Sequence, residues 1–194
     1  MNYKFDIEIV LDAPIGPIVA AYMDAEHYVH LHKDNTSKYT VFEKLKENGL
    51  KIRVRQYWKF LGCFAGHECV SEYIPPTTFR HSNFKPVPWW IPSAHHLVKI
   101  QTTLNHYPDD TQQKTISRTR IEIDMPFWLY PFRTWMERWF RNIKKRVSDE
   151  DMDMILRREK IFGRNNINSY LVKSHFLLYK EEFVRHFAAK PIGE

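Results

Sequence analysis

Apolar and polar residues alternate at the start of the chain, and this alternation is the clearest pattern in the sequence. The apolar positions are Tyr3, Phe5, Ile7, Ile9 and Leu11, and charged residues separate the first four of them. A period of two predicts a β-strand that has one face on the core. Asp12-Ala-Pro14 ends this strand, and the apolar residues 15–23 predict a short helix that leads into a histidine-rich stretch.

Alternating segments continue through the middle of the chain. Residues 38–60 predict a hairpin around Asn48-Gly49, a dipeptide that tolerates the positive φ angles of a tight turn. Four further strands are expected over residues 67–74, 79–84, 94–107 and 114–125, with proline-containing turns between them. We therefore expect an α+β protein with an antiparallel sheet of about six or seven strands.

The segment 86–92 contains three prolines and the pair Trp89-Trp90. Proline removes a ladder donor, so this segment is not expected to be a central strand. Its rings would cap the end of the core, or they would form a lid over a pocket or a tip that touches a membrane.

From Trp128 onward the period of the apolar positions becomes helical. One stripe consists of Trp128, Phe132, Trp135, Met136, Trp139, Phe140, Ile143 and Val147. We expect this stripe to pack on the sheet while the basic residues beside it face solvent. A membrane surface or a nucleic acid is the alternative partner for such a helix, because basic residues interleaved with aromatic rings suit both.

A second helix is expected to begin near Ser148, because the acidic residues 149–151 would occupy its first turn. Asp151 is the acid that projects toward the apolar side of this helix, and Glu159 is a second inward candidate. The residues Gly-Arg-Asn-Asn at 163–166 interrupt the helix, and a last helix is predicted over residues 170–187.

The composition fits a single domain over residues 1–194, since 43% of the residues are hydrophobic and 15% are aromatic. The formal net charge of +6 does not by itself identify a partner. Cys63 and Cys69 lack metal-binding spacing and are expected to be free thiols. The first residues do not resemble a signal peptide, so we expect a soluble, cytoplasmic protein. We do not expect a nucleic-acid partner.

Residues 24–32 concentrate side chains that can bind metals. His27, His30 and His32 fall within six positions, and Asp24 stands three residues before the first of them. These residues form either a partly solvated helix end or one part of a metal site that is completed from elsewhere in the chain. On an ideal helix His27 and His30 are the closer pair, because residues five apart point about 140° away from each other.

The predicted order of elements is a strand, two short helices, a curved antiparallel sheet and a C-terminal helical region. This order resembles the helix-grip domains, which are the START or Bet v 1-like (SRPBCC) superfamily, over nearly the whole chain. The resemblance implies a cavity between the sheet and the long helix, and hence a hydrophobic small-molecule ligand or substrate.

One branch of this superfamily, the catalytic domain of Rieske non-haem iron oxygenases, carries an Asp-x-x-His-x4-His motif and a later Asp. Asp24, His27 and His32 match the motif, and Glu150-Asp151 matches the later position. The resemblance implies that His27, His32 and Asp151 bind Fe(II), and that Asp24 acts in catalysis as the carboxylate toward a redox centre. The Rieske cluster motifs are absent, so an external electron-transfer protein would have to supply the electrons.

Two classes of function follow from these patterns. The first is a mononuclear non-haem Fe(II) oxygenase that acts on a hydrophobic or aromatic molecule. The second is a metal-free hydrophobic-ligand-binding protein or polyketide-cyclase-like enzyme, in which the histidines have polar or acid–base roles. Weak peripheral membrane contact through residues 86–92 and the basic residues Arg141, Lys144, Lys145 and Arg146 is a further expectation.

Overall fold

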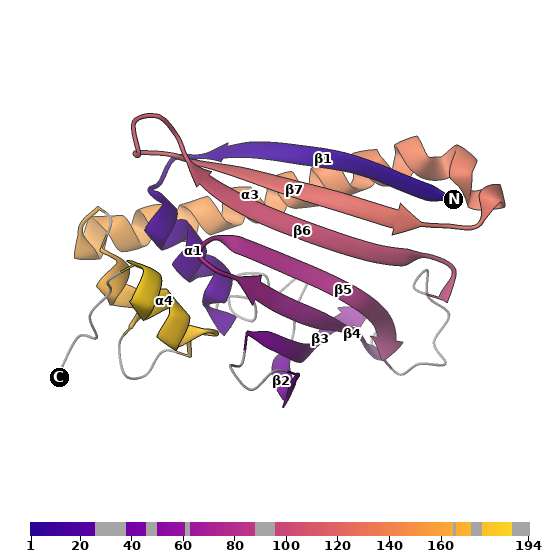
Figure 1. Cartoon of the computed structure of the whole chain (residues 1–194), viewed down its shortest axis with the longest axis horizontal. Helices are drawn as coiled ribbons and strands as arrows, with labels where there is room; N and C mark the ends of the chain where they lie inside the picture. Colours follow the sequence, from indigo (N-terminus) through magenta and orange to yellow (C-terminus); the bar gives the residue numbers. More distant parts are fainter. Residues whose placement is uncertain are drawn as a thin grey trace.

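The computed structural model describes residues 1–25, 38–45, 50–60, 63–87, 96–164, 166–171 and 176–187. The strands are β1 (Asn2–Leu11), β2 (Lys38–Lys44), β3 (Lys51–Phe60), β4 (Cys63–Ile74), β5 (Thr78–Val87), β6 (Lys99–Pro108) and β7 (Thr115–Asp124). The helical elements are α1 (Ile15–Met23), η2 (Phe127–Phe132), α3 (Arg133–Phe162), η3 (Ile167–Tyr170) and α4 (Lys180–Phe187). Figure 1 shows the sheet with α3 behind β1 and β7, and with α1 and α4 near one end.

The seven strands form one antiparallel sheet in the order β1-β7-β6-β5-β4-β3-β2. Strands β2 to β7 follow one another as a meander, and β1 is added beside the last strand. The arrangement confirms the expected α+β class and the expected sheet. The pairing of β2 with β3 also confirms the predicted hairpin, although Asn48-Gly49 itself lies outside the described residues.

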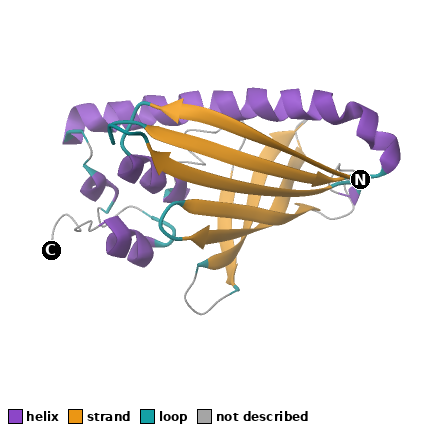
Figure 2. Cartoon of the chain, turned by 45° about the horizontal axis from the view of Figure 1, so that its top comes forward, coloured by secondary structure: helices purple, strands orange, loops and turns teal. Residues whose placement is uncertain are grey.

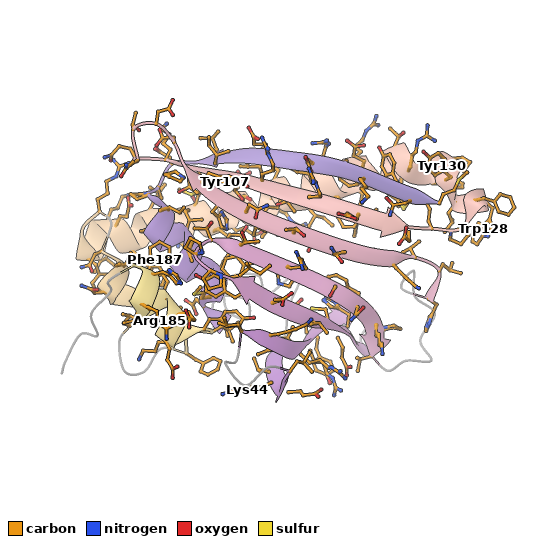
Figure 3. All side chains as sticks on the ribbon, viewed as in Figure 1. Lys44, Tyr107, Trp128, Tyr130, Arg185 and Phe187 are labelled. Carbon is orange, nitrogen blue, oxygen red and sulfur yellow. The ribbon has the colours of Figure 1, made fainter. Side chains whose placement is uncertain are left out.

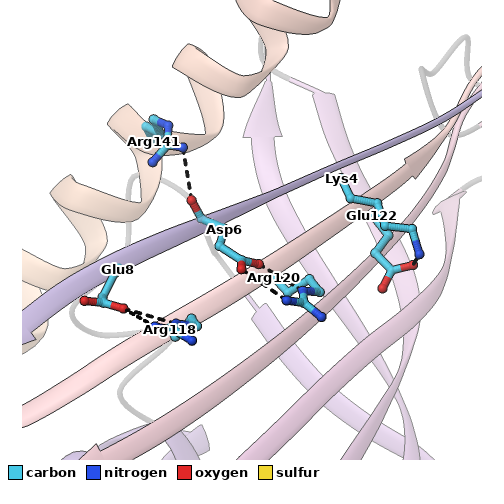
Figure 4. A network of polar contacts seen from close by, with 7 residues as sticks. All are labelled: Lys4, Asp6, Glu8, Arg118, Arg120, Glu122 and Arg141. Atoms are coloured by element: carbon cyan, nitrogen blue, oxygen red, sulfur yellow. Dashed lines mark hydrogen bonds and ion pairs between the residues drawn. The ribbon is translucent and has the colours of Figure 1, made fainter.

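Cross-strand ion pairs mark the register of β1 against β7 on the outer face of the sheet. Lys4 pairs with Glu122, Asp6 with Arg120 and Glu8 with Arg118, as Figure 4 shows. The alternate residues of β1 face inward, where Phe5 and Ile7 are buried. A shift of one residue would bury the charges and expose these apolar side chains, so the alternation specifies the register.

α3 runs along the β1 side of the sheet (Figure 2). Its first half packs on an apolar cluster that includes Phe5, Ile7, Ile121 and Ile123, and the ring centroids of Phe5 and Phe140 are 6.1 Å apart. A larger cluster joins α1, β3 to β5, α4 and Ile155 of α3. No helix in the described ranges is long and apolar enough to cross a membrane.

The boundaries of the C-terminal helices differ from those predicted. α3 continues without a break through Ser148, which is buried inside the helix. The acidic residues that suggested a new helix start lie within α3, where Asp149 accepts an ion pair from Lys145 one turn earlier. Such a pair between residues four apart stabilises a continuous helix, which explains why the acidic run does not begin a new one.

The predicted helix over residues 170–187 is also wrong in its extent. Tyr170 ends η3, and α4 begins only at Lys180. Between them, Phe176 O accepts a hydrogen bond from Ala25 N, and Leu178 N donates one to Met23 O. The backbone of this segment is thus bound to the end of α1, which excludes the hydrogen bonds of a helix at the same positions.

The predicted loop over residues 86–92 begins two residues too early. Pro86 and Val87 belong to β5, where they pair with His67 and Gly66 of β4. The register of β5 with β6 covers only Thr78–His81, so Pro86 lies where β5 has β4 as its paired neighbour. Proline is tolerated there because no second ladder requires its missing N–H. Trp89 and Trp90 lie outside the described residues.

The aromatic stripe predicted for α3 does not pack as one face. Met136 and Phe140 contact the apolar cluster beneath α3, whereas Trp128, Phe132, Trp135 and Trp139 are exposed. Trp128 and Phe132 belong to the 3-10 helix η2, whose tighter winding changes their direction relative to α3. Trp135 and Trp139 lie roughly 60° to 100° from Met136 around the helix, outside the buried sector.

Candidate functional site

The inner face of the sheet changes from apolar to polar along β7. Ile123 and Ile121 belong to the apolar cluster under α3, and the next inward positions are Thr119, Ser117 and Thr115, all buried. Opposite Ser117 on β6 stands His106, whose side chain is 1% exposed. The alternation of the two strands thus places several polar groups together inside the molecule.

Most of these buried polar atoms have no hydrogen-bond partner among the described residues. Nδ1 and Nε2 of His106, Oγ of Ser117 and Oγ1 of Thr119 are all unpartnered. Thr115 differs, because its hydroxyl donates a hydrogen bond of 2.8 Å to Ala13 O. A buried polar atom without a partner costs about 1–3 kcal/mol, so a group of them marks a place where a further polar molecule would be stabilising.

Helices α1 and α3 bring a tyrosine and a lysine to the same interior. The rings of Tyr22 and His106 have centroids 4.8 Å apart, and Tyr22 also stacks on Phe79 at 5.9 Å. Lys144 Nζ donates a hydrogen bond to Tyr22 Oη and lies 4.9 Å from the centre of the Tyr22 ring. One turn of α1, one turn of α3 and strand β6 therefore meet at Tyr22.

Burial changes the protonation of these groups. It lowers the pKa of the Lys144 amine to about 8, against an opposing effect of the Asp151 carboxylate. Burial also raises the pKa of Tyr22 well above its ordinary value, and Asp151 adds to this. The pKa values of His106 and His81 fall to about 3 and about 4, mainly through burial and secondarily through the charge of Lys144. Near neutral pH the site thus holds neutral imidazoles, a neutral phenol and an amine that loses its proton readily.

Two carboxylates singled out in the sequence lie in this part of the fold. Asp151 is buried on α3 two turns after Lys144, so its predicted inward direction is confirmed. Asp24 is buried at the C-terminal end of α1, where it forms an isolated bridge with Leu177. α1 and α3 are in contact, which places both acids near the junction of these helices.

The proposed iron ligands His27 and His32, and the competing His30, lie outside the described residues. Within the described ranges, no three His, Cys, Asp or Glu side chains are grouped so that they could hold a metal ion. This result leaves the set His27, His32 and Asp151 as a prediction, because two of its three members are not described. Of the two cysteines that were expected to be free thiols, Cys69 is free, and its side chain is also buried.

The sequence reasoning missed Tyr22, His81, His106 and Lys144. Lys144 was assigned to the solvent-facing basic side of the helix, and that assignment is wrong. Its position gave a usable signal, since Lys144 follows Phe140 by four residues and precedes Asp151 by seven, both of which point inward. His81 and His106 likewise stand two residues after the buried Phe79 and Leu104 on their strands.

Two hollows lie away from this interior cluster in the described part of the molecule. One of about 270 Å³ lies beside β3, β4 and β5, where Arg53, Glu68 and Asn83 line it. The other, of about 240 Å³, follows Glu150, Met154 and Ile161 along α3. Neither hollow is lined by Tyr22, His106 or Lys144. The buried polar groups of the interior cluster, and not the volume of either hollow, therefore indicate the candidate site.

Comparison with known proteins identifies the fold. No family model matches the sequence, and no curated protein sequence is similar to it. Among solved structures, Ara h 8.0201 matches with a TM-score of 0.62 and 10% identity, over 80% of this chain and 99% of its own. A START superfamily protein from Mycobacterium smegmatis matches with a TM-score of 0.57 and 9% identity, over 78% and 98% of the two chains.

The Zhui aromatase/cyclase from Streptomyces sp. R1128 matches with a TM-score of 0.55 and 11% identity, over 85% of this chain and 98% of its own. Identities this low establish the fold alone. The fold is the helix-grip fold of START and Bet v 1-like proteins, as the order of elements predicted. None of these three structures is described as an iron oxygenase.

Proposed function

We propose that this protein binds a hydrophobic small molecule in the interior of its helix-grip fold and holds a polar group of that molecule against β6 and β7. The observation that carries the proposal is the set of buried, unpartnered atoms on His106, Ser117 and Thr119. A ligand oxygen would accept hydrogen bonds from the two hydroxyls, and the surrounding apolar residues would cover the rest of the molecule. The cyclase among the structural neighbours supports this class of function.

The pair of Lys144 and Tyr22 adds acid–base chemistry to this binding role. In its neutral form, the Lys144 amine would remove a proton from a carbon next to a ligand carbonyl, giving an ammonium and an enolate. Hydrogen bonds from Ser117 and Thr119 would stabilise the enolate oxygen. Tyr22 stays protonated and hydrogen-bonded to Lys144, so it orients the amine. Proton return from Lys144 to the product would complete a cyclisation or isomerisation.

Binding can be tested with variants on a single strand. Replacing Ser117 by Ala and Thr119 by Val removes two unpartnered hydroxyls, so we expect thermal stability to be kept or raised. Native mass spectrometry of metal-free protein should show a hydrophobic ligand retained by the wild type, and on the order of tenfold weaker retention by the double variant.

Thr115→Val is the matched control for this experiment, because the Thr115 hydroxyl is already bonded to Ala13 O. We expect this variant to lose about 1 kcal/mol of stability and to keep the ligand. Equal retention by the wild type and the Ser117/Thr119 double variant, or the absence of any retained ligand, would contradict the binding proposal.

The acid–base role has a separate measurement, which is deuterium exchange at the carbon next to the carbonyl of an aromatic ketone probe. The exchange rate should rise as the pH passes through about 8, where half of the Lys144 amines are neutral, and level off at higher pH. Lys144→Met should abolish the protein-dependent exchange, and Tyr22→Phe should lower it while the ketone still binds. Exchange that is unchanged in Lys144→Met would remove Lys144 from the chemistry and leave the binding function intact.

The iron oxygenase remains a second proposal, which rests on the burial of Asp151 and Asp24 and on the position of Asp24 three residues before His27 in the sequence. His27, His32 and Asp151 would hold Fe(II), and the metal would supply the activation of dioxygen with electrons from another protein. Iron analysis of anaerobically purified protein tests this directly. Near-stoichiometric iron that is lost in Asp151→Ala and kept in Asp149→Ala supports it, and metal-free wild type after iron-replete expression rejects it.

A further inference from the structure

The junction of η2 and α3 exposes an aromatic surface that the interior site does not use. We define the aromatic patch as Phe127, Trp128, Phe132, Trp135 and Trp139, whose exposed fractions range from 49% to 76%. They stand within thirteen consecutive residues, and Trp135 and Trp139 are one turn apart on the same side of α3. Five large rings are more than the scattered exposed hydrophobic residues of an ordinary surface, and such a patch marks an interaction site.

The patch lies at one end of the molecule. Figure 3 shows Trp128 projecting beyond the sheet at the end opposite to Arg185 and Phe187 of α4. The surface is therefore separate from the Tyr22 and Lys144 site, and it can meet a flat partner without obstruction by the helices at the other end.

The charges around the patch are strongly basic. Besides Lys144, which faces the interior, residues 127–146 contain the five cations Arg133, Arg138, Arg141, Lys145 and Arg146, and the single carboxylate Glu137. Glu137 is already bound to Arg141 and to Tyr3. Arg133 stacks on Tyr130 at 4.5 Å, while the Arg138 side chain is exposed next to Trp139. A partner of complementary charge must therefore be anionic.

We propose that the aromatic patch docks this protein on the surface of an anionic lipid bilayer. Tryptophan and phenylalanine rings enter the boundary between head groups and acyl chains, while adjacent arginines bind the phosphates and carboxylates above it. A second copy of the chain fits less well, since a two-fold interface would bring the same cations together. The surface differs from the basic cluster expected from the sequence, because Lys144 points inward and Arg141 is occupied by Glu137 and by Asp6 O.

The test is co-sedimentation with vesicles of phosphatidylcholine, with and without phosphatidylserine. We expect the wild type to bind the anionic vesicles, and to be released by salt. Trp135→Gln combined with Trp139→Gln should lower the partition coefficient on the order of tenfold. Arg138→Gln should lower it about fivefold, which corresponds to the ~1 kcal/mol that one cation contributes near an anionic surface.

Tyr107→Gln is the matched control, because Tyr107 is 47% exposed on β6, comparable to Trp139, and lies away from the patch (Figure 3). This variant should bind the vesicles as the wild type does, and circular dichroism should show all variants folded. Equal binding to neutral and anionic vesicles, or unchanged binding by the tryptophan double variant, overturns the proposal. So does a dimer in solution that the tryptophan variant dissociates while the wild type ignores vesicles.

Discussion

His106 shows how burial in the interior changes the hydrogen bonding and the pKa of a single side chain. Its ring packs against both Tyr22 and Phe79, both of its nitrogens lack a partner in the described part of the chain, and burial lowers its pKa to about 3. An apolar residue of similar size would fill the same space without an unpartnered polar atom. The unpartnered imidazole is therefore one of the observations on which the proposed ligand binding rests.

The lowered pKa of His106 predicts acid sensitivity. The unfolded chain takes up a proton near pH 6.5, whereas the folded protein does not until about pH 3. The contribution of His106 to the free energy of unfolding is therefore fully present above pH 6.5. It decreases as the pH falls toward 3, by about 3 kcal/mol at pH 4. His81 acts in the same direction, because burial lowers its pKa as well.

Urea unfolding at several pH values measures this effect. His106→Phe should remove most of the acid-dependent loss, while His186→Gln on the exposed side of α4 should keep it. If the free energy of unfolding depends on pH between 6.5 and 4 to the same extent in the wild type and in His106→Phe, then His106 is not held neutral by the fold.

At the scale of elements, the two sides of the C-terminal half of α3 are expected to contribute unequally to the free energy of unfolding. Ile155 and Leu156 are adjacent apolar residues of α3, but Ile155 is 1% exposed and Leu156 is 39% exposed. Ile155→Ala should cost about 2–5 kcal/mol of unfolding free energy, because it leaves a cavity in the core. Leu156→Ala should cost well under half of that. Denaturant melts of both variants provide the comparison, and equal losses would contradict the helix orientation.

The strands were more predictable than the helices, for physical reasons. β1 and β7 each have one face on the core, so the period of two fixes both their existence and their register. The bounds of the helices depend on tertiary contacts instead. Ser148 stays inside α3 although acidic residues follow it, and residues 176–178 are drawn to α1 by backbone hydrogen bonds. No local pattern contains that information.

At the scale of the whole molecule, the order of the elements was sufficient to predict the helix-grip fold, but it was not sufficient to identify the interior site. Tyr22, His106 and Lys144 come from α1, β6 and α3, and they meet only because the sheet and α3 enclose the same space. The inward direction of Asp151 follows from its position on the helix relative to the apolar residues. Lys144 was missed because a lysine in a basic run is normally solvated.

The short register between β5 and β6 has a mechanical consequence. Only Thr78–His81 pairs with Thr102–Asn105, whereas β6 and β7 pair over ten residues, and Asn83 just beyond has a φ of 55°. The sheet therefore consists of two leaves, β1-β7-β6 and β5-β4-β3-β2, joined along a narrow seam. We expect amide hydrogen exchange to be faster over residues 99–101, which pair with β7 but not with β5, than over residues 118–124. A molecule with such a seam can widen its interior by spreading the two leaves, so a ligand could enter and leave while every helix stays folded.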